Sequence, residues 1–155
     1  MTVTHGDSHT YIGMDIHFKG NREVTIAMID YLTECIDDID EDCSTVVATP
    51  AGYHVFESNP DCPKLTEEKR KKVHSIVAKR LFVAMRARPD IQVPVSYLTP
   101  RVMKADENDW KKLKRMLQHI NATINMKMTL SVDNLSVIKT HATLLLTLLI
   151  LIDQF

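Results

Sequence analysis

The chain has 155 residues, of which 45% are hydrophobic and 25% are charged, and its formal net charge is −1. This length and hydrophobic content predict one soluble globular domain with a modest core. Its three cysteines are an odd number without a close pair, which excludes a disulfide framework and a Cys-x-x-Cys metal site.

The charges are unevenly distributed along the chain. From Asp30 to Asp61 there are nine acidic residues and no Lys or Arg, whereas from Glu67 to Asp90 there are eight Lys or Arg and three acids. An ordinary solvated helix face explains such a basic stretch as well as a surface that meets a polyanion does.

Alternating apolar residues near the N-terminus predict a β-hairpin. Tyr11–Phe18 alternates as one half-buried strand, Lys19-Gly20-Asn21 forms the turn, and residues 23–28 (EVTIAM) form the second strand. Asp30 then caps a short helix whose apolar positions are Tyr31, Leu32, Cys35, Ile36 and Ile39.

An acidic run, 37–42, follows this helix. Clustered carboxylates suit magnesium or calcium, but the run lacks the spaced oxygen ligands and central Gly of a calcium loop, so a solvated helix end is expected. Residues 44–64 contain three prolines and no sustained period, and they predict a long connecting arm. We expect neither a metal nor another cofactor.

The stretch 65–91 is predicted to be a helix that begins at the cap Thr66 and ends near Arg88, before Pro89. A helical period places one set of residues on a packing side (Val73, Val77, Leu81, Ala84). It places a cationic set with one aromatic ring on the opposite side (Lys72, Ser75, Lys79, Phe82, Arg86).

Two more helices and a strand are expected downstream. Asp90 caps a helix that Pro100 ends near Thr99, and Asp106 caps another. The Asp106 helix has an apolar stripe (Trp110, Leu113, Leu117, Ile120) and a basic outer face (Lys111, Lys112, Lys114, Arg115). Residues 126–132 alternate as a strand and Asp133-Asn134 forms a turn, while 140–155 stay unassigned between strand, helix and tail.

Neither end of the chain indicates export or membrane insertion. The N-terminus has no apolar run after a basic start, and the apolar run Ala142–Ile152 is shorter than the roughly 20 residues that span a bilayer. We expect an intracellular protein, in the cytoplasm or nucleus, without a membrane partner.

No nucleophile motif, Gly-rich phosphate loop or His-rich metal motif occurs in the sequence. Residues and composition alone therefore predict a small α+β protein with an N-terminal β-hairpin, a helical bundle and a short C-terminal strand region, and they leave its function open.

Several segments together resemble the back half of the reverse transcriptase domain of copia-type LTR retrotransposon Pol polyproteins. They are YIGMDIHF (11–18), the ATPAG-like loop, the tetrapeptide Arg88-Pro89-Asp90-Ile91, and WKKLKR (110–115) followed by the Asn-Ala-Thr-Ile turn. The resemblance runs from about Thr2 to Lys139.

The resemblance implies three parts: the end of a palm with a primer-grip-like hairpin (1–64), a thumb-like helical segment (65–125), and a strand with a truncated or frameshifted C-terminus (126–155). The family's Tyr-x-Asp-Asp hairpin, which holds the catalytic metals, would precede this sequence, so the chain alone is expected not to be an enzyme. The family continues into RNase H where this chain has THATLLLTLLILIDQF.

The hairpin and the thumb-like helices resemble the surface with which the family binds an RNA-DNA hybrid or other duplex. The resemblance implies that Tyr11, Gly13 and Met14 lie near a primer end. It implies that cations and an aromatic ring follow the wide minor groove of an A-like duplex (Lys72, Lys79, Phe82, Arg86). The alternative is a protein-interaction module without a nucleic-acid role, and self-association through the exposed hairpin edge is also expected.

Overall fold

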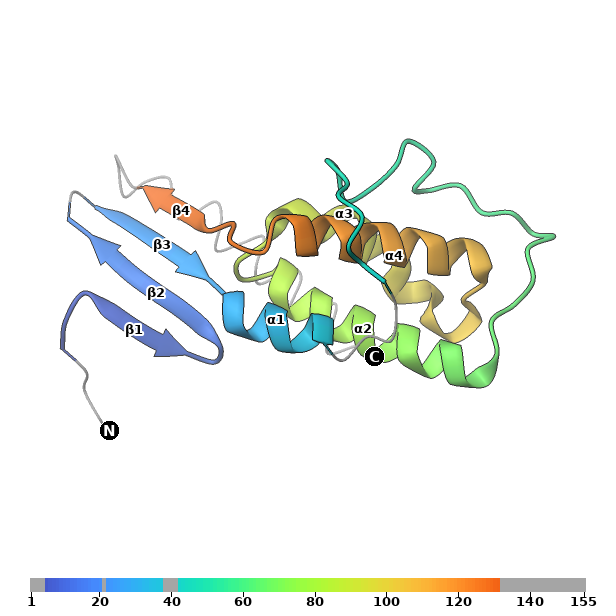
Figure 1. Ribbon diagram of the computed structural model, residues 1–155, viewed down its shortest axis with the longest axis horizontal. Coiled ribbons are helices and arrows are strands. Elements are labelled where there is room, and N and C mark those ends of the chain that lie inside the picture. The colour runs from blue at the N-terminus through green and yellow to red at the C-terminus, as the bar shows by residue number, and fades with distance from the viewer. Residues whose placement is uncertain (1–4, 21, 38–41, 132–155) are drawn as a thin grey trace.

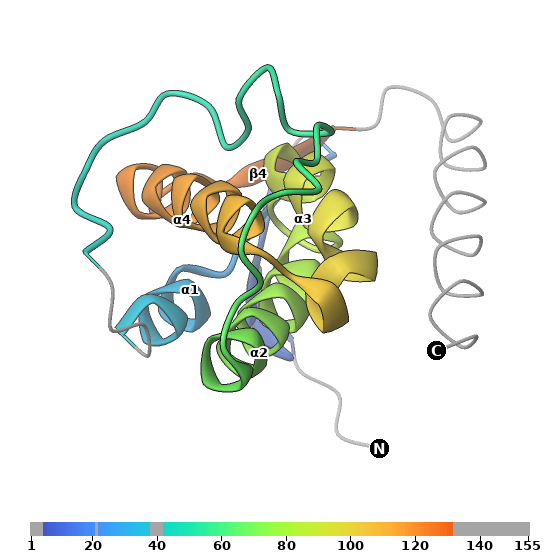
Figure 2. The same cartoon turned by 90° about the vertical axis from the view of Figure 1, so that its right-hand side faces the viewer.

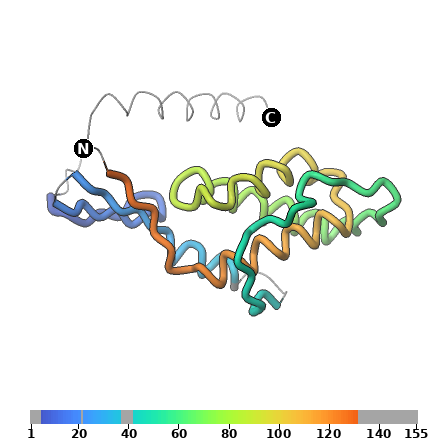
Figure 3. The backbone as a smooth tube through the Cα atoms, turned by 90° about the horizontal axis from the view of Figure 1, so that it is seen from above, coloured from blue at the N-terminus to red at the C-terminus, as the bar shows by residue number. Residues whose placement is uncertain are grey.

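A computed structural model shows an antiparallel sheet beside a group of helices, which confirms the predicted α+β class. It describes residues 5–20, 22–37 and 42–131. The sheet projects from one end of the helical part (Figure 1), and the view from above shows the two parts side by side (Figure 3). The predicted turn at 133–134, Ile39, most of the acidic run and the unassigned 140–155 lie outside the described residues.

The sheet has four strands in the order β1-β2-β3-β4, all antiparallel. They are β1 (Ser8–Tyr11), β2 (Met14–Lys19), β3 (Glu23–Ala27) and β4 (Met128–Ser131). The predicted hairpin is confirmed in β2 and β3, where Ile16 lies opposite Ile26. The predicted C-terminal strand is confirmed as β4, which pairs with β3 through Met128 and Ile26.

The prediction of one strand over Tyr11–Phe18 is wrong, because the chain reverses after Tyr11. Ile12 and Gly13 have φ angles of 49° and 72°. Two consecutive positive φ values are typical of a two-residue type I′ hairpin loop. This turn adds β1 to the sheet, with Tyr11 opposite Met14.

Helix α1 (Ile29–Asp37) follows β3 almost directly. Leu32 and Cys35 are buried, as the pattern predicted, whereas Asp30 lies in the first turn of the helix and is not its cap. The predicted start was two residues too late, because α1 begins at Ile29 and the residue that flanks its start is Met28.

Helix α2 (Glu67–Ala84) begins as predicted, since the Thr66 side chain accepts a hydrogen bond from the Lys69 N–H. It ends at Ala84, four residues before the predicted end. Pro89 disfavours helical geometry at Arg88, which has φ −131° and ψ 67°. The N–H groups of 86, 87 and 88 all donate to the Val83 carbonyl, so the chain tightens before it leaves the helix.

A 3-10 turn (Pro89–Ile91), helix α3 (Gln92–Leu98) and a 3-10 segment (Thr99–Lys104) come next. The predicted break near Thr99 is confirmed, because α3 ends at Leu98 and its cap, Thr99, precedes Pro100. The assignment of Asp90 as a helix cap is wrong. Its carboxylate accepts hydrogen bonds from Arg88 instead.

Helix α4 (Glu107–Ala122) starts at Asp106 with a reciprocal capping box, in which Asp106 and Asp109 each accept the other's N–H. Leu113, Leu117 and Ile120 are buried, which confirms most of the predicted stripe, and Trp110 is half-buried.

The core lies among these helices. In a view along them, α1, α2, α3 and α4 surround it and the 44–64 arm passes over α4 (Figure 2). The buried members of the core include Val73, Val77 and Val83 of α2, Val95 and Leu98 of α3, and Leu113, Met116 and Ile120 of α4. Residues 44–64 form no helix or strand, as predicted, apart from a β-bridge between Lys64 and Asp106. Within the described ranges, no helix is both long and apolar enough to cross a membrane.

Candidate nucleic-acid interface

The cationic side of α2 begins with Lys72 and Lys79, which are seven residues, or about 10 Å, apart along the helix. Lys72 is exposed and Lys79 is half-buried. Both lysines already have an interaction partner within the chain, so their charges are partly compensated in the free protein. Arg86 lies beyond the end of α2, in the tight turn before Pro89.

Phe82 was predicted to lie opposite the packing side of α2, and this assignment is wrong. Its ring packs against the edge of the core and meets the Tyr31 ring of α1 at 5.6 Å between centroids. The Arg86 guanidinium lies 3.8 Å from the Phe82 ring centroid, and Arg86 Nη1 donates to the Phe82 carbonyl oxygen at 3.2 Å. The pattern of α2 alone could not show that α1 covers this side as well.

The β1–β2 turn reaches the same place. A Cβ atom on Gly13 would lie 3.6 Å from Tyr31 Cδ2 and 3.7 Å from Met28 Cε. Met14 packs against the core, while Tyr11 is 62% exposed beside the turn. The turn therefore presents Tyr11 to solvent and keeps Met14 inside.

Tyr31 joins the two predicted groups of residues. Burial raises the pKa of its hydroxyl, Cys35 adds to this, and the charges of Lys79 and Arg80 act in the opposite direction. Gly13 and Phe82 therefore meet at Tyr31, Arg86 joins them through Phe82, and Lys79 acts on Tyr31 through its charge. Lys72 lies two turns from Lys79 along α2. Tyr31 was predicted only as an apolar position of α1, and its sequence context carries no signal for a linking role.

Beneath the cationic side, Arg80 is 1% exposed. Its Nη2 donates to the Cys35 carbonyl oxygen at 3.2 Å, at the C-terminal end of α1, where a cation is favourable. Its Nε and Nη1 have no hydrogen-bond partner among the described residues, and burial lowers the pKa of this guanidinium. Arg80 therefore adds positive potential that no ligand can contact directly.

The tetrapeptide 88–91 has a structural role. Arg88 is 1% exposed and makes two hydrogen bonds to the Asp90 carboxylate, at 2.9 and 2.7 Å. It also donates to the backbone and side-chain oxygens of Thr123, in the turn after α4. His119 completes the cluster, with Nε2 3.1 Å from Asp90 Oδ2 and Nδ1 3.2 Å from the Val47 carbonyl oxygen. Two of the segments that carry the resemblance, 88–91 and the turn after α4, therefore contact each other.

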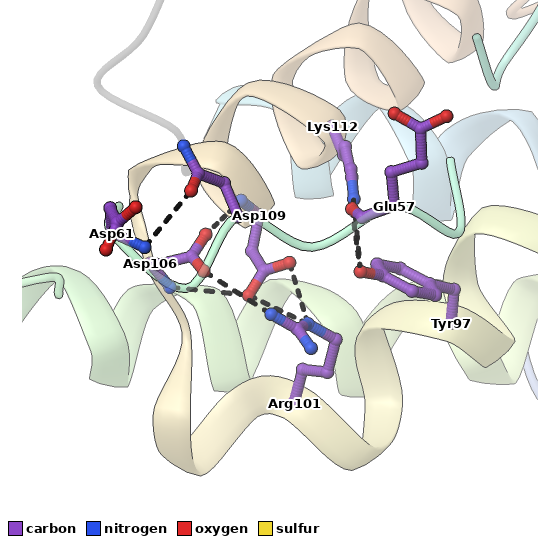
Figure 4. A network of polar contacts seen from close by, with 8 residues as sticks. Glu57, Asp61, Tyr97, Arg101, Asp106, Asp109 and Lys112 are labelled. Atoms are coloured by element: carbon purple, nitrogen blue, oxygen red, sulfur yellow. Dashed lines mark hydrogen bonds and ion pairs between the residues drawn. The ribbon is translucent and has the colours of Figure 1, made fainter. Parts of the chain in front are cut away.

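The prediction of a basic outer face on α4 is only partly right, because the arm covers some of it. Lys112 donates to the Glu57 carbonyl oxygen and to the Tyr97 hydroxyl (Figure 4). Arg115 Nη2 donates to Thr49 Oγ1 at 3.0 Å. Lys111 is the exposed member of the predicted set, whereas Lys112, Lys114 and Arg115 are half-buried.

The start of α4 is held by a separate ion-pair network, also drawn in Figure 4. Arg101 Nε lies 2.9 and 3.0 Å from the two carboxylate oxygens of the fully buried Asp109, and Nη2 lies 3.4 Å from Asp106. The hydrogen bonds to Asp109 raise the pKa of Arg101. This network fixes the helix start, and the neighbouring Glu107 carboxylate pairs with Lys69 of α2 at 3.4 Å.

The sequence of the chain is similar to that of a yeast transposon protein. The chain is 26% identical over 124 residues to a transposon Ty5-1 protein of Saccharomyces cerevisiae. The match covers 78% of this chain and 39% of the yeast protein. No model of a known protein family matches the chain, and no solved structure does. The chain is therefore distantly related to a transposon protein.

Proposed function

We propose that the chain is a remnant of a copia-type reverse transcriptase that keeps a template-primer surface and lacks polymerase chemistry. Residues 1–64 would be the end of the palm with the primer-grip hairpin, 65–125 the thumb-like helices, and 126–155 a strand with a truncated or frameshifted end. The similarity to a transposon protein supports this origin. So does the ordered set of motif segments, two of which, 88–91 and the turn after α4, contact each other.

The observation that carries the proposal is the meeting of the β1–β2 turn with the end of α2. Gly13 approaches Tyr31, Tyr31 packs on Phe82, and Arg86 covers Phe82. A primer end near Tyr11, Gly13 and Met14 would thus lie beside the duplex that follows α2. One continuous surface can contact both.

Lys72, Lys79 and Arg86 would neutralise phosphates along the duplex. An A-like duplex offers a wide, shallow minor groove flanked by closely spaced phosphates, which suits a helix that carries cations along one side. Phe82 would act by holding Arg86 in place, because its ring is already covered by Tyr31 and the guanidinium.

The sequence contains no Tyr-x-Asp-Asp tetrapeptide, which is the family's source of metal-binding carboxylates. We therefore infer that these 155 residues bind but do not extend a primer. Polymerase activity of this chain by itself would overturn that part of the proposal.

The test is a titration with an RNA-DNA hybrid at 50 and 200 mM salt. Three phosphate contacts predict that affinity falls roughly 40-fold over this range, from a salt slope of about −0.9 per contact. The triple variant Lys72→Gln, Lys79→Gln, Arg86→Gln should bind weakly and lose most of the salt dependence.

A matched control removes three exposed cations elsewhere, Lys19, Lys104 and Lys127, by the same change to Gln. It should keep most of the affinity. Absence of binding at low salt, or equal losses in both triple variants, would contradict the proposed surface and favour the protein-interaction alternative.

A further inference from the structure

A cleft lies between the arm and α4, away from the α2 surface. It has a volume of about 210 Å³. Its walls include Pro50, Val55 and Pro94, and its cations are Lys111, Lys112 and Arg115. No Asp or Glu is among its described lining residues. The three cations in the lining give the cleft a positive potential, with the Glu57 carboxylate held by His54 at its mouth.

Arg115 is the most informative of these residues. Its Nη2 is held by Thr49, but its Nε is buried and has no hydrogen-bond partner in the part of the chain that the structure describes. Buried N–H donors are nearly always paired, because leaving one unpaired costs free energy. A ligand oxygen would satisfy it only after the Arg115 side chain or the arm shifts, because Nε is enclosed in this conformation.

The other donors at the cleft are differently placed. Lys111 is exposed and makes no ion pair with any described residue. Lys112 is held by Tyr97, with Nζ 4.3 Å from the ring centroid and 3.1 Å from the hydroxyl oxygen. At the mouth, His54 pairs with Glu57 at 2.7 Å, so it is already occupied. One exposed cation and two held ones thus border the apolar wall of the cleft.

We propose that this cleft binds the phosphate group of a nucleotide, either free or in a nucleic-acid strand. A guanidinium and an ammonium match phosphate oxygens through charge-assisted hydrogen bonds. The apolar wall suits part of the base or sugar, and the volume, below the roughly 300 Å³ of a usual small-molecule pocket, excludes a ligand larger than one nucleotide. The site does not depend on the proposed duplex surface.

The test is calorimetric titration at low salt with adenosine monophosphate, with inorganic phosphate, and with a short single strand bearing either a 5′-phosphate or a 5′-hydroxyl. We expect the monophosphate to bind. The variant Lys111→Gln, Arg115→Gln should weaken its binding about tenfold or more, since each charge-assisted hydrogen bond is worth a factor of that order. Lys104→Gln, on the 3-10 segment, is the charge-matched control and should change little.

Lys111→Gln alone covers the case in which loss of Arg115 unfolds the arm, because Lys111 has no partner to lose among the described residues. Tighter binding of the 5′-phosphorylated strand than of adenosine monophosphate would assign the site to a strand. Absence of monophosphate binding, binding of inorganic phosphate alone, or no effect of Lys111→Gln would overturn the proposal. The Lys72, Lys79, Arg86 variant should keep this binding, so the two proposals fail independently.

Discussion

The ion pair of Arg88 and Asp90 connects the end of α2 to the turn after α4. Arg88 is 1% exposed, and its charge is balanced by Asp90 and by the oxygens of Thr123. Removing one partner of a buried ion pair leaves the other charge uncompensated, which is far more costly than the net worth of the pair.

The variant Asp90→Asn keeps the shape of the side chain and removes its charge. We expect it to lower the free energy of unfolding by about 3 kcal/mol, measured by urea denaturation at neutral pH. Asp61→Asn is the control, because Asp61 is exposed and should change stability little. Equal stability of the two variants would show that Arg88 is satisfied without Asp90.

The same carboxylate predicts a pH dependence. Burial of Asp90 raises its pKa, but the hydrogen bonds and charge of Arg88, with the hydrogen bond to His119, outweigh burial and lower the pKa below its ordinary value. A lowered folded-state pKa contributes stability that is present above the unfolded-state value and is lost as the pH falls through the folded-state value. We expect wild-type stability to decline below about pH 4 and Asp90→Asn to show a shallower decline, in thermal melts between pH 2 and 6. Parallel profiles would contradict this.

At the scale of elements, the β1–β2 turn explains why one strand was predicted where two exist. The alternation of 11–18 continues through the turn, and Ile12 is a β-branched residue that rarely adopts a positive φ. A period of two identifies extended segments but cannot detect a reversal without Asn-Gly or a similar signal. The β2–β3 hairpin was predictable because Lys19-Gly20 interrupts the pattern.

This turn predicts a stabilising substitution. Ile12 has φ 49° and is 53% exposed, so it has conformational strain and little burial to lose. Asn is favoured at the first position of a type I′ turn before Gly. Ile12→Asn should raise the free energy of unfolding by about 1 kcal/mol, whereas Gly13→Ala should lower it. A destabilised Ile12→Asn variant would mean that the Ile12 side chain packs in solution.

The sheet also has an apolar face that is incompletely covered. Phe18 lies opposite Val24, and Val24 lies opposite Leu130, so all three point to one side. Phe18 is 48% exposed and Leu130 is 47% exposed. With β1 and β4 at the outer edges of the sheet, this face and these edges favour the expected self-association.

Phe18→Lys should therefore reduce the concentration dependence of the average mass in sedimentation equilibrium. Thr129→Lys places the same charge on the opposite face of the sheet and is the control. If both variants associate as the wild type does, self-association does not use this face.

For the whole molecule, the sequence predicted the class, the helix starts at Thr66 and Asp106, and the break before Pro100, because caps and prolines act locally. It could not predict how the arm covers α4 or how α1 covers Phe82. Residues 44–64 have no period that relates them to a partner, and the periodicity of one helix does not show which neighbours it meets. The Arg80 and Arg115 guanidinium groups that the fold encloses were hidden for the same reason.

The central claim is that the surface formed by the β1–β2 turn and α2 fits an A-like duplex. The most direct measurement compares affinities for an RNA-DNA hybrid and for a DNA duplex of the same sequence at one salt concentration. The hybrid should bind more tightly, because its wide minor groove admits the α2 side chains. Equal affinity, or tighter binding of the DNA duplex, would contradict the claim and leave only non-specific attraction to phosphate.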